Sequence, residues 1–156
     1  MADVSESRAL DDPRLSSIPH EVVRHGPARS LEEAATARGL QPSQLIKTMV
    51  VRRAADDYLF VLVPGDRVIS WPKLRGHLGV NRLSMPDAEE ARTVTGYERG
   101  TITPLGSARD WPILVDAHLS NVVSLGGGAH GVSVTLSSTD LVGALDAEVV
   151  DVTDPV

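Results

Sequence analysis

Two β-rich runs in the first half of the chain constrain its fold more than any other feature. Residues 46–53 and 58–63 are mostly apolar, and only four residues, 54–57, separate them. Runs of this length with so short a connection predict a β-hairpin. Because the apolar side chains are almost continuous and do not alternate with polar ones, we expect both strands to be covered on both faces. The sequence therefore predicts a central hairpin with packed layers on each side.

Helix and strand signals alternate irregularly along the rest of the chain. Ser30 with Glu33, and Asp87 with Glu90, form capping boxes that predict helix starts, and Ser70 and Ser137 precede two further helical segments. Additional strands are expected at 20–25, 67–70, 81–85, 111–117, 122–125, 132–136 and 148–152. Strands interrupted singly and in pairs by four helices indicate an α/β fold with a mixed sheet and not a regular βαβ series.

Length and composition limit the possible architecture and partners. The 156 residues are most simply a flexible, acidic N-terminal tail at 1–17 followed by a single domain at 18–156. Cysteine is absent, which excludes disulfides, cysteine-ligated zinc and a cysteine nucleophile. No segment is typical of a signal peptide or a membrane span, so we expect a cytoplasmic location and no membrane partner. The net charge of −6 argues against extensive phosphate neutralisation, so any RNA contact would be local.

The stretch 96–106 is dense in turn-forming residues, with three glycines and Pro104. Glycine reaches positive φ without a steric penalty, and proline fixes its own φ. The backbone N–H groups of Thr101, Ile102 and Thr103 could therefore turn outward toward a ligand. A plain surface turn explains the same residues equally well.

Lys47 is an unusual choice in this chain, because thirteen arginines accompany only two lysines and Lys47 lies in an apolar strand. It could extend its ammonium to the surface from a strand end, or it could bind an oxyanion, a phosphate or a ribose hydroxyl in a cleft. Position alone leaves both open. Thr48 should point to the opposite face of the strand, which favours a packing role.

Glycine and histidine offer further candidates near the chain ends. The cluster 126–131 reads as a hairpin turn, although consecutive glycines also permit close approach to a ligand. His25 precedes Gly26 and Pro27, as expected of a strand-end surface residue. The five histidines show no spacing typical of a metal site, so no metal and no other cofactor are expected.

Three of these features resemble one protein family. Gly100-Thr101-Ile102-Thr103-Pro104 fits the G-x-x-x-P loop of the YbaK/EbsC family, relatives of the prolyl-tRNA synthetase editing domain. The Lys47-Thr48 pair and the late glycine cluster stand in the family's order, so that the resemblance covers roughly residues 20–152. It implies a strongly curved, barrel-like mixed sheet with surrounding helices.

The resemblance also implies roles for individual residues. Lys47 would be catalytic together with backbone donors from Gly100, Thr101 and Ile102, which would stabilise the oxyanion of ester hydrolysis. The residues implied to bind substrate are His25, Thr103, Pro104, Gly127, Gly128 and His130. Many relatives carry a basic pair where this chain has Ala129-His130, so an electrostatic role of that loop is in doubt. No G-x-S-x-G motif is present, so we expect water to attack, with assistance from the terminal ribose hydroxyl.

The predicted function is that of a freestanding aminoacyl-tRNA editing hydrolase, a deacylase that cleaves the ester bond of mischarged tRNA. Its partners would be the 3′ end of aminoacyl-tRNA and, in some settings, an aminoacyl-tRNA synthetase. One alternative is a non-catalytic module of the same fold that binds tRNA or a synthetase. A second alternative, with less support, is a hydrolase of another small acyl or phosphate metabolite.

Overall fold

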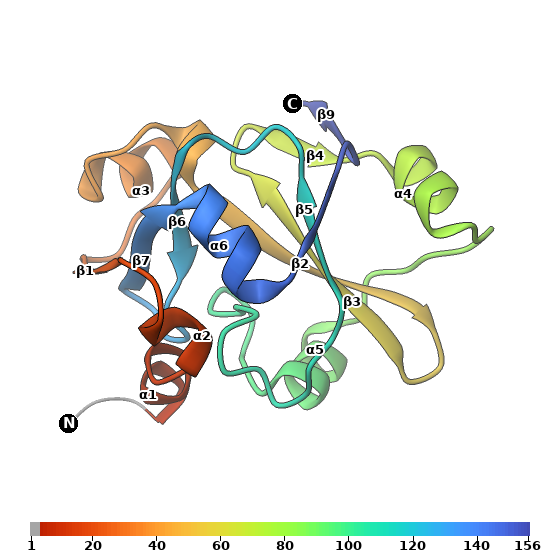
Figure 1. The fold of residues 1–156 in the computed structure, drawn as a ribbon, viewed down its shortest axis with the longest axis horizontal. Helices are drawn as coiled ribbons and strands as arrows, with labels where there is room; N and C mark the ends of the chain where they lie inside the picture. The colour runs from red at the N-terminus through yellow and green to blue at the C-terminus, as the bar shows by residue number, and fades with distance from the viewer. Residues whose placement is uncertain (1–3) are drawn as a thin grey trace.

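The computed structural model describes residues 4–156 and has a mixed α/β fold (Figure 1). The helices are α1 (Val4–Leu10), α2 (Pro13–Ser16), α3 (Leu31–Ala37), α4 (Trp71–Leu78), α5 (Ala88–Thr95) and α6 (Ser138–Leu145), with a short 3-10 turn at Pro42–Gln44. The strands are β1 (Glu21–Arg24), β2 (Ile46–Ala54), β3 (Asp57–Pro64), β4 (Arg67–Ile69), β5 (Ile113–Asp116), β6 (Val122–Gly126), β7 (Val132–Ser137), β8 (Glu148–Val150) and β9 (Thr153–Pro155).

The predicted hairpin is confirmed and forms half of the largest sheet. That sheet has the order β2-β3-β5-β8, with β2 antiparallel to β3 and the two other neighbouring pairs parallel. The hairpin turns at Asp56, whose φ of 57° lies in the left-handed region that aspartate tolerates better than most residues. The mixed sheet predicted from the irregular order of elements is therefore also confirmed.

Both faces of β3 are buried, as its continuous apolar run predicted, whereas several residues of β2 are only half-buried. Phe60 and Leu62 of β3 face a large core that also contains side chains from α5, α6 and the second sheet. The alternate residues Leu59 and Val61 face a smaller core, which Leu74 of α4 completes. Figure 1 shows α4 on one side of the molecule and α6 on another, with the long hairpin between them.

The strands outside the central sheet form two further sheets. One is antiparallel with the order β1-β7-β6, and the other pairs β4 with β9. A parallel bridge between Leu45 and Ser124 links the first of these to the start of β2. Pairing is thus divided among three sheets, so the expected single barrel-like sheet is not confirmed. Residues 81–85, expected as a strand, form only one bridge, from Ser84 to Arg52.

The predicted N-terminal tail is wrong for residues 4–16, while 1–3 lie outside the described residues. Helices α1 and α2 occupy this segment, and Asp12 caps α2 by accepting a hydrogen bond from the Arg14 N–H. Ala9 and Leu15 are completely buried in the large core. A short segment with few apolar residues resembles a tail in sequence, but two well-placed side chains anchor it. None of the helices in residues 4–156 has the length and apolar character needed to cross a bilayer.

Candidate active site at the open edge of β2

Strand β2 forms an edge of the central sheet, and this edge is open over most of its length. Bridges to Ser124 at Leu45 and to Ser84 at Arg52 close its two ends. The N–H and C=O of Arg52 both form hydrogen bonds with Ser84, on the side of β2 that faces away from β3. In an antiparallel strand every second residue directs its N–H and C=O to the same side, so those of Val50 and Thr48 also face away from β3. Between the two bridges, the backbone N–H and C=O groups of Thr48 and Val50 are therefore placed to form hydrogen bonds with a ligand beside the strand.

A cavity of about 700 Å³ lies along this open edge. Strand β2 forms one wall, and the start of α5 with the segment before it forms another. The loop that follows α5, the end of β6 and the side chain of Arg38 complete the lining. The lining residues are Arg38, Ile46, Lys47, Thr48, Met49, Val50, Met85, Pro86, Asp87, Ala88, Ala91, Arg99, Gly100, Ile102 and Gly126. A volume of this size is typical of small-molecule sites.

Lys47 lines the cavity, and its amino group is held at a defined place. Nζ donates a hydrogen bond to the backbone carbonyl of Arg67 in β4. Burial lowers the pKa of the Lys47 ammonium, and the nearby carboxylate of Asp66 opposes this effect. An ammonium has three N–H donors, so two remain beyond the bond to Arg67, a residue that does not itself line the cavity.

The loop 100–104 contributes unevenly to the cavity. Gly100 and Ile102 line it, and their backbone N–H groups form no hydrogen bond within residues 4–156. The N–H and the hydroxyl of Thr101 both donate to the carbonyl of Glu98, so the expected donation from Thr101 to a ligand does not hold in this structure. Thr103 and Pro104 are buried and lie outside the lining.

The glycines of the cluster 126–131 have two different surroundings: one lines the cavity and the others pack against the rest of the protein. Gly126 lines the cavity, whereas Gly127 and Gly128 do not. A Cβ on Gly128 would lie 2.6 Å from the carbonyl oxygen of Ser5 in α1, so this glycine permits close helix packing. His130 lies against the loop, because a Cβ on Gly100 would be 3.1 Å from its Cε1 atom.

His25 is not brought to the cavity. Its N–H donates to the carbonyl of Gly131, so the residue lies beside the turn between β6 and β7. Its ring Nδ1 is 3.3 Å from the carbonyl of Gly26. The strand-end role favoured by its sequence position therefore fits the structure better than a place in the pocket wall.

Most residues of the cavity lining were missed from the sequence, among them the polar residues Arg38, Thr48 and Arg99. Thr48 was expected to be a packing residue because it alternates with Lys47. The cavity reaches around the strand edge, however, so neighbours on opposite faces of β2 both line it. The hydroxyl of Thr48 is buried without a partner among the described residues. The sequence signal that could have pointed to Thr48 is its polar side chain within an apolar strand.

Helix α1 holds the ends of the glycine-rich loop through Arg8. Its Nε donates to the carbonyl of Gly106 at 2.9 Å, and its Nη2 donates to the carbonyl of Gly96 at 2.8 Å. The guanidinium also lies 4.5 Å from the centre of the Tyr97 ring, a cation–π distance. One side chain thus joins the two ends of the loop that carries Gly100 and Ile102.

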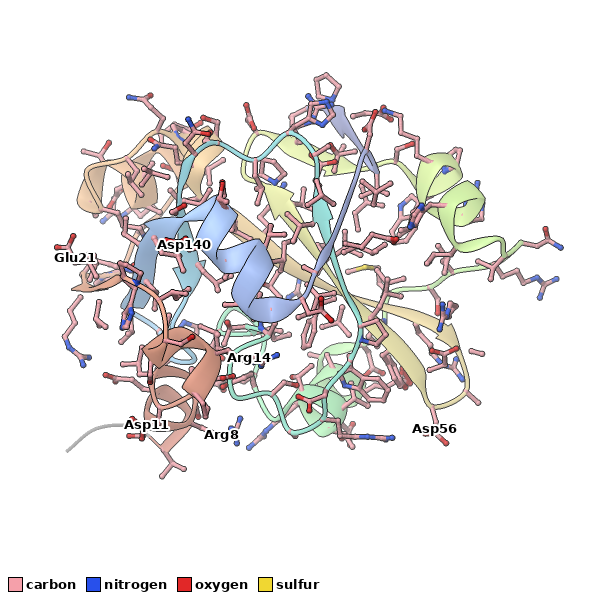
Figure 2. All side chains as sticks on the ribbon, in the orientation of Figure 1. Arg8, Asp11, Arg14, Glu21, Asp56 and Asp140 are labelled. Carbon is pink, nitrogen blue, oxygen red and sulfur yellow. The ribbon has the colours of Figure 1, made fainter. Side chains whose placement is uncertain are left out.

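Helix α2 holds the same loop through an ion pair, and Figure 2 shows Arg14 extending toward it. Arg14 Nη2 lies 2.7 Å from Asp12 Oδ2 and also donates to the carbonyl of Pro104. Asp12 Oδ2 in turn accepts the N–H of Gly106 at 2.8 Å. We refer to Arg8, Asp12 and Arg14 as the N-terminal brace. Its bonds fix the position of the loop beside the cavity.

The brace gives a prediction for the pH dependence of stability. Burial acts to raise the pKa of Asp12, but hydrogen bonds from Arg14 and Gly106 outweigh it and hold the pKa below the usual 3.8. A depressed folded-state pKa stabilises the protein above the unfolded-state value, and this stability is lost as the pH falls through the folded-state value. Asp12→Asn should therefore be less stable than wild type at pH 7, with the difference shrinking below about pH 4.

Urea unfolding of both proteins from pH 7 to pH 2 measures this difference. The matched control is Asp11→Asn, because Asp11 is the neighbouring carboxylate and is exposed. We expect the control to follow the wild type at every pH. A constant difference between wild type and Asp12→Asn down to pH 2 would contradict the assigned role of the carboxylate.

Gly100 gives a second prediction. Its φ of +90° is unfavourable for any residue with a Cβ, and the added methyl would also press against His130. Gly100→Ala should therefore lose about 1–3 kcal/mol of unfolding free energy. Gly26→Ala is the control, because nothing lies within 4 Å of its added Cβ. Chemical denaturation of the two variants measures the effect, and equal stabilities would show that the turn at Gly100 tolerates a side chain.

Asp116, His118 and Asp151 form the cluster that could hold a metal ion, with possible ligand atoms within 4.8 Å of one another. Protein donors already occupy these carboxylates. Asp116 Oδ1 accepts the N–H of Val152, its Oδ2 accepts from His118, and Asp151 pairs with Lys73. The cluster is thus explained by its own hydrogen bonds, and the absence of a metal stays a prediction.

The fold and the site together define a small α/β domain with a ligand cavity at a sheet edge, bordered by a lysine and a glycine-proline loop. Residues 25–144 match the model of one family, the aminoacyl-tRNA editing domain. Since this match covers well over half of the 156 residues, the chain belongs to the aminoacyl-tRNA editing domain family. The resemblance drawn from the sequence motifs is confirmed.

Individual relatives agree with this assignment. The chain is 30% identical over 130 residues to proline–tRNA ligase of Bacillus licheniformis and 34% identical over 126 residues to that of Heliobacterium modesticaldum. These matches cover 83% and 81% of the chain but only 22% of each ligase. A crystal structure described as a proposed trans-editing enzyme for prolyl tRNA synthetase is 26% identical, with a TM-score of 0.86 over 99% of both chains.

Proposed function

We propose that this protein is an aminoacyl-tRNA deacylase, which hydrolyses the ester between a wrongly attached amino acid and the 3′-terminal ribose of tRNA. The observation that supports this most is the shared cavity. Lys47 from β2 and the loop residues Gly100 and Ile102, far apart in the chain, line the same cavity. Membership in the editing-domain family gives the class of substrate. The synthetase relatives suggest that a synthetase is a partner as well.

The lining suggests that water is the nucleophile. Within the described residues, the cavity wall contains no histidine, serine or cysteine that could act as a nucleophile with an adjacent base. Water oxygen would attack the carbonyl carbon, and a tetrahedral oxyanion would form. Its collapse would break the carbon–oxygen bond of the ester, and the ribose oxygen would leave with a proton.

The oxyanion would be stabilised by donors that have no other partner. The N–H groups of Gly100 and Ile102 border the cavity without a hydrogen bond to any of residues 4–156. The two remaining N–H donors of Lys47 would orient the terminal nucleotide. Removing one such donor commonly slows acyl transfer by about a hundredfold to a thousandfold. A few preorganised donors are therefore sufficient for an activated ester.

The apolar part of the wall would set the selectivity. Ile46, Val50 and Ala91 line the cavity from β2 and α5. An apolar pocket distinguishes side chains mainly by size, so it would admit small aminoacyl groups and exclude larger ones. This is the discrimination that a synthetase site for a small amino acid makes poorly by itself.

A deacylation screen tests the proposal. The protein is mixed with a panel of tRNAs, each charged with one labelled amino acid, and release of the free amino acid is followed. We expect fast release from a small subset of mischarged tRNAs and background rates for the others. Background rates for every tRNA, combined with measurable tRNA binding, would favour the non-catalytic binding module instead.

A further inference from the structure

Arg38 is placed in the cavity without the partners that a half-buried arginine usually has. It follows α3 as the C-cap residue and is one of the residues that line the cavity. Nη1 donates to the hydroxyl of Ser124 at 3.0 Å. Nε is buried without a hydrogen-bond partner among the described residues. Within residues 4–156, no carboxylate lies within ion-pair distance of Arg38.

Burying the Arg38 guanidinium without a counter-charge costs free energy unless a ligand binds beside it. Burial without a counter-charge lowers the pKa of the Arg38 guanidinium, which shows that its surroundings disfavour the positive charge. Buried charges in proteins are normally paired or fully hydrogen-bonded. Thr48, in the same cavity wall, also has a buried hydroxyl with no partner among the described residues. Two residues that line one cavity thus each have a buried polar atom without a partner among residues 4–156.

The position of the Arg38 side chain is fixed by a hydrogen bond to strand β6. Ser124 is completely buried in β6, and its hydroxyl holds one end of the guanidinium. Ser124 and Gly126 are two residues apart on one strand, so they face the same way, and Gly126 lines the cavity. The guanidinium is therefore held at Nη1, and Nη2, which forms no hydrogen bond within residues 4–156, is the donor left for a ligand.

We propose that Arg38 forms an oxyanion subsite in the cavity, which Thr48 also lines, and that this subsite recognises a negatively charged group of the substrate. Guanidinium presents donors in a planar fork that fits carboxylate and phosphate oxygens. The subsite rests on the proposed function, because it supposes that the end of a charged tRNA occupies the cavity. It adds a recognition element that acts before any bond is broken.

Two parts of an aminoacyl-tRNA end carry such an oxyanion. One is the phosphate on the 5′ side of the terminal adenosine, and the other is the side-chain carboxylate of an acidic aminoacyl group. Two ligand pairs separate them. AMP and adenosine differ only in the phosphate, whereas aspartate α-methyl ester and alanine methyl ester differ in the carboxylate.

Binding of these four compounds to the full chain is measured by NMR titration of the wild type, Arg38→Gln and Arg29→Gln. Arg29 is the matched control, because it is exposed and lies outside the cavity. We expect wild type and Arg29→Gln to bind the charged member of one pair about tenfold more tightly, as one charge-assisted hydrogen bond provides. Arg38→Gln should bind both members of that pair equally.

The pair that is discriminated identifies the group that Arg38 recognises. If the wild type discriminates neither pair, or if Arg38→Gln keeps the full preference, the subsite proposal is overturned. Should Arg38→Gln fail to fold, as judged by circular dichroism, Arg38→Lys takes its place. It keeps the charge without the fork and should reduce the preference, whereas an unchanged preference would again overturn the proposal. None of these measurements depends on hydrolysis, so they separate this proposal from the deacylase proposal.

Discussion

Replacing Lys47 with methionine is expected to slow the hydrolysis of a mischarged tRNA by about a hundredfold or more. Methionine keeps an unbranched apolar stem in the wall of the cavity but has no N–H donor. The loss would therefore fall on the orientation of the terminal nucleotide and not on packing. Single-turnover hydrolysis of the best substrate from the deacylation screen measures the effect.

The chain offers a matched control for this experiment in Lys73, its only other lysine. The amino group of Lys73 contacts Asp151, Asp154 and the carbonyl of Thr153, and Lys73 does not line the cavity. Lys73→Met should hydrolyse the substrate at the wild-type rate. Equal rates for the wild type and Lys47→Met would show that the Lys47 ammonium takes no part in the reaction.

The second large effect is expected at Leu15, in a segment that resembles a tail in sequence. Its side chain is completely buried in the large core, where α2 packs near α6. Truncating a buried leucine to alanine removes apolar contacts and leaves a cavity, which costs about 2–5 kcal/mol. Leu15→Ala should therefore lose about that much unfolding free energy.

Urea unfolding monitored by circular dichroism measures this loss. Val4→Ala is the control in the same N-terminal segment, because Val4 is 79% exposed and its truncation should change stability by less than about 0.5 kcal/mol. If Leu15→Ala were as stable as Val4→Ala, the N-terminal helices would contribute nothing to the core. The brace would then have no anchor for holding the loop.

The features predicted well from the sequence are those with local causes. The hairpin of β2 and β3 follows from two apolar runs and a short connection. The helix starts predicted at Ser30 and Asp87 are confirmed as N-caps, since Ser30 Oγ accepts from the Glu33 N–H at 3.1 Å and Asp87 Oδ1 from the Glu90 N–H at 2.8 Å, although the reciprocal bond of a full capping box is found only between Gln41 and Gln44 among the described residues. In each case the residues that decide the structure lie within a few positions of one another.

The features that were missed depend on contacts between distant segments. The helical N-terminus is fixed by Leu15 in the core and by Asp12 at Gly106, and neither contact leaves a periodic pattern in the sequence. The division into three sheets depends on which strand edges remain open, and propensity does not encode this. The bridge of Arg52 to Ser84 illustrates the point, because it replaces a whole predicted strand.

The candidate site was predicted only in part, because it too depends on contacts between distant segments. Motif resemblance pointed to Lys47, Gly100 and Ile102, and all three line one cavity, while their catalytic roles stay a prediction. It could not separate Gly126, which lines the cavity, from Gly128, which packs against α1. Arg38 belongs to no motif that was considered, and only the three-dimensional arrangement reveals a guanidinium with no carboxylate of residues 4–156 within ion-pair distance.

The most direct measurement of the central claim is a crystal structure of the protein with a stable substrate analogue, an adenosine whose 3′ hydroxyl is replaced by an amide-linked alanine. We expect the analogue to lie along the open edge of β2, with its amide oxygen within hydrogen-bond distance of the N–H groups of Gly100 and Ile102 and the nucleoside near Lys47. Density for the analogue outside this cavity, or an amide oxygen directed away from the loop, would contradict the assignment of the site.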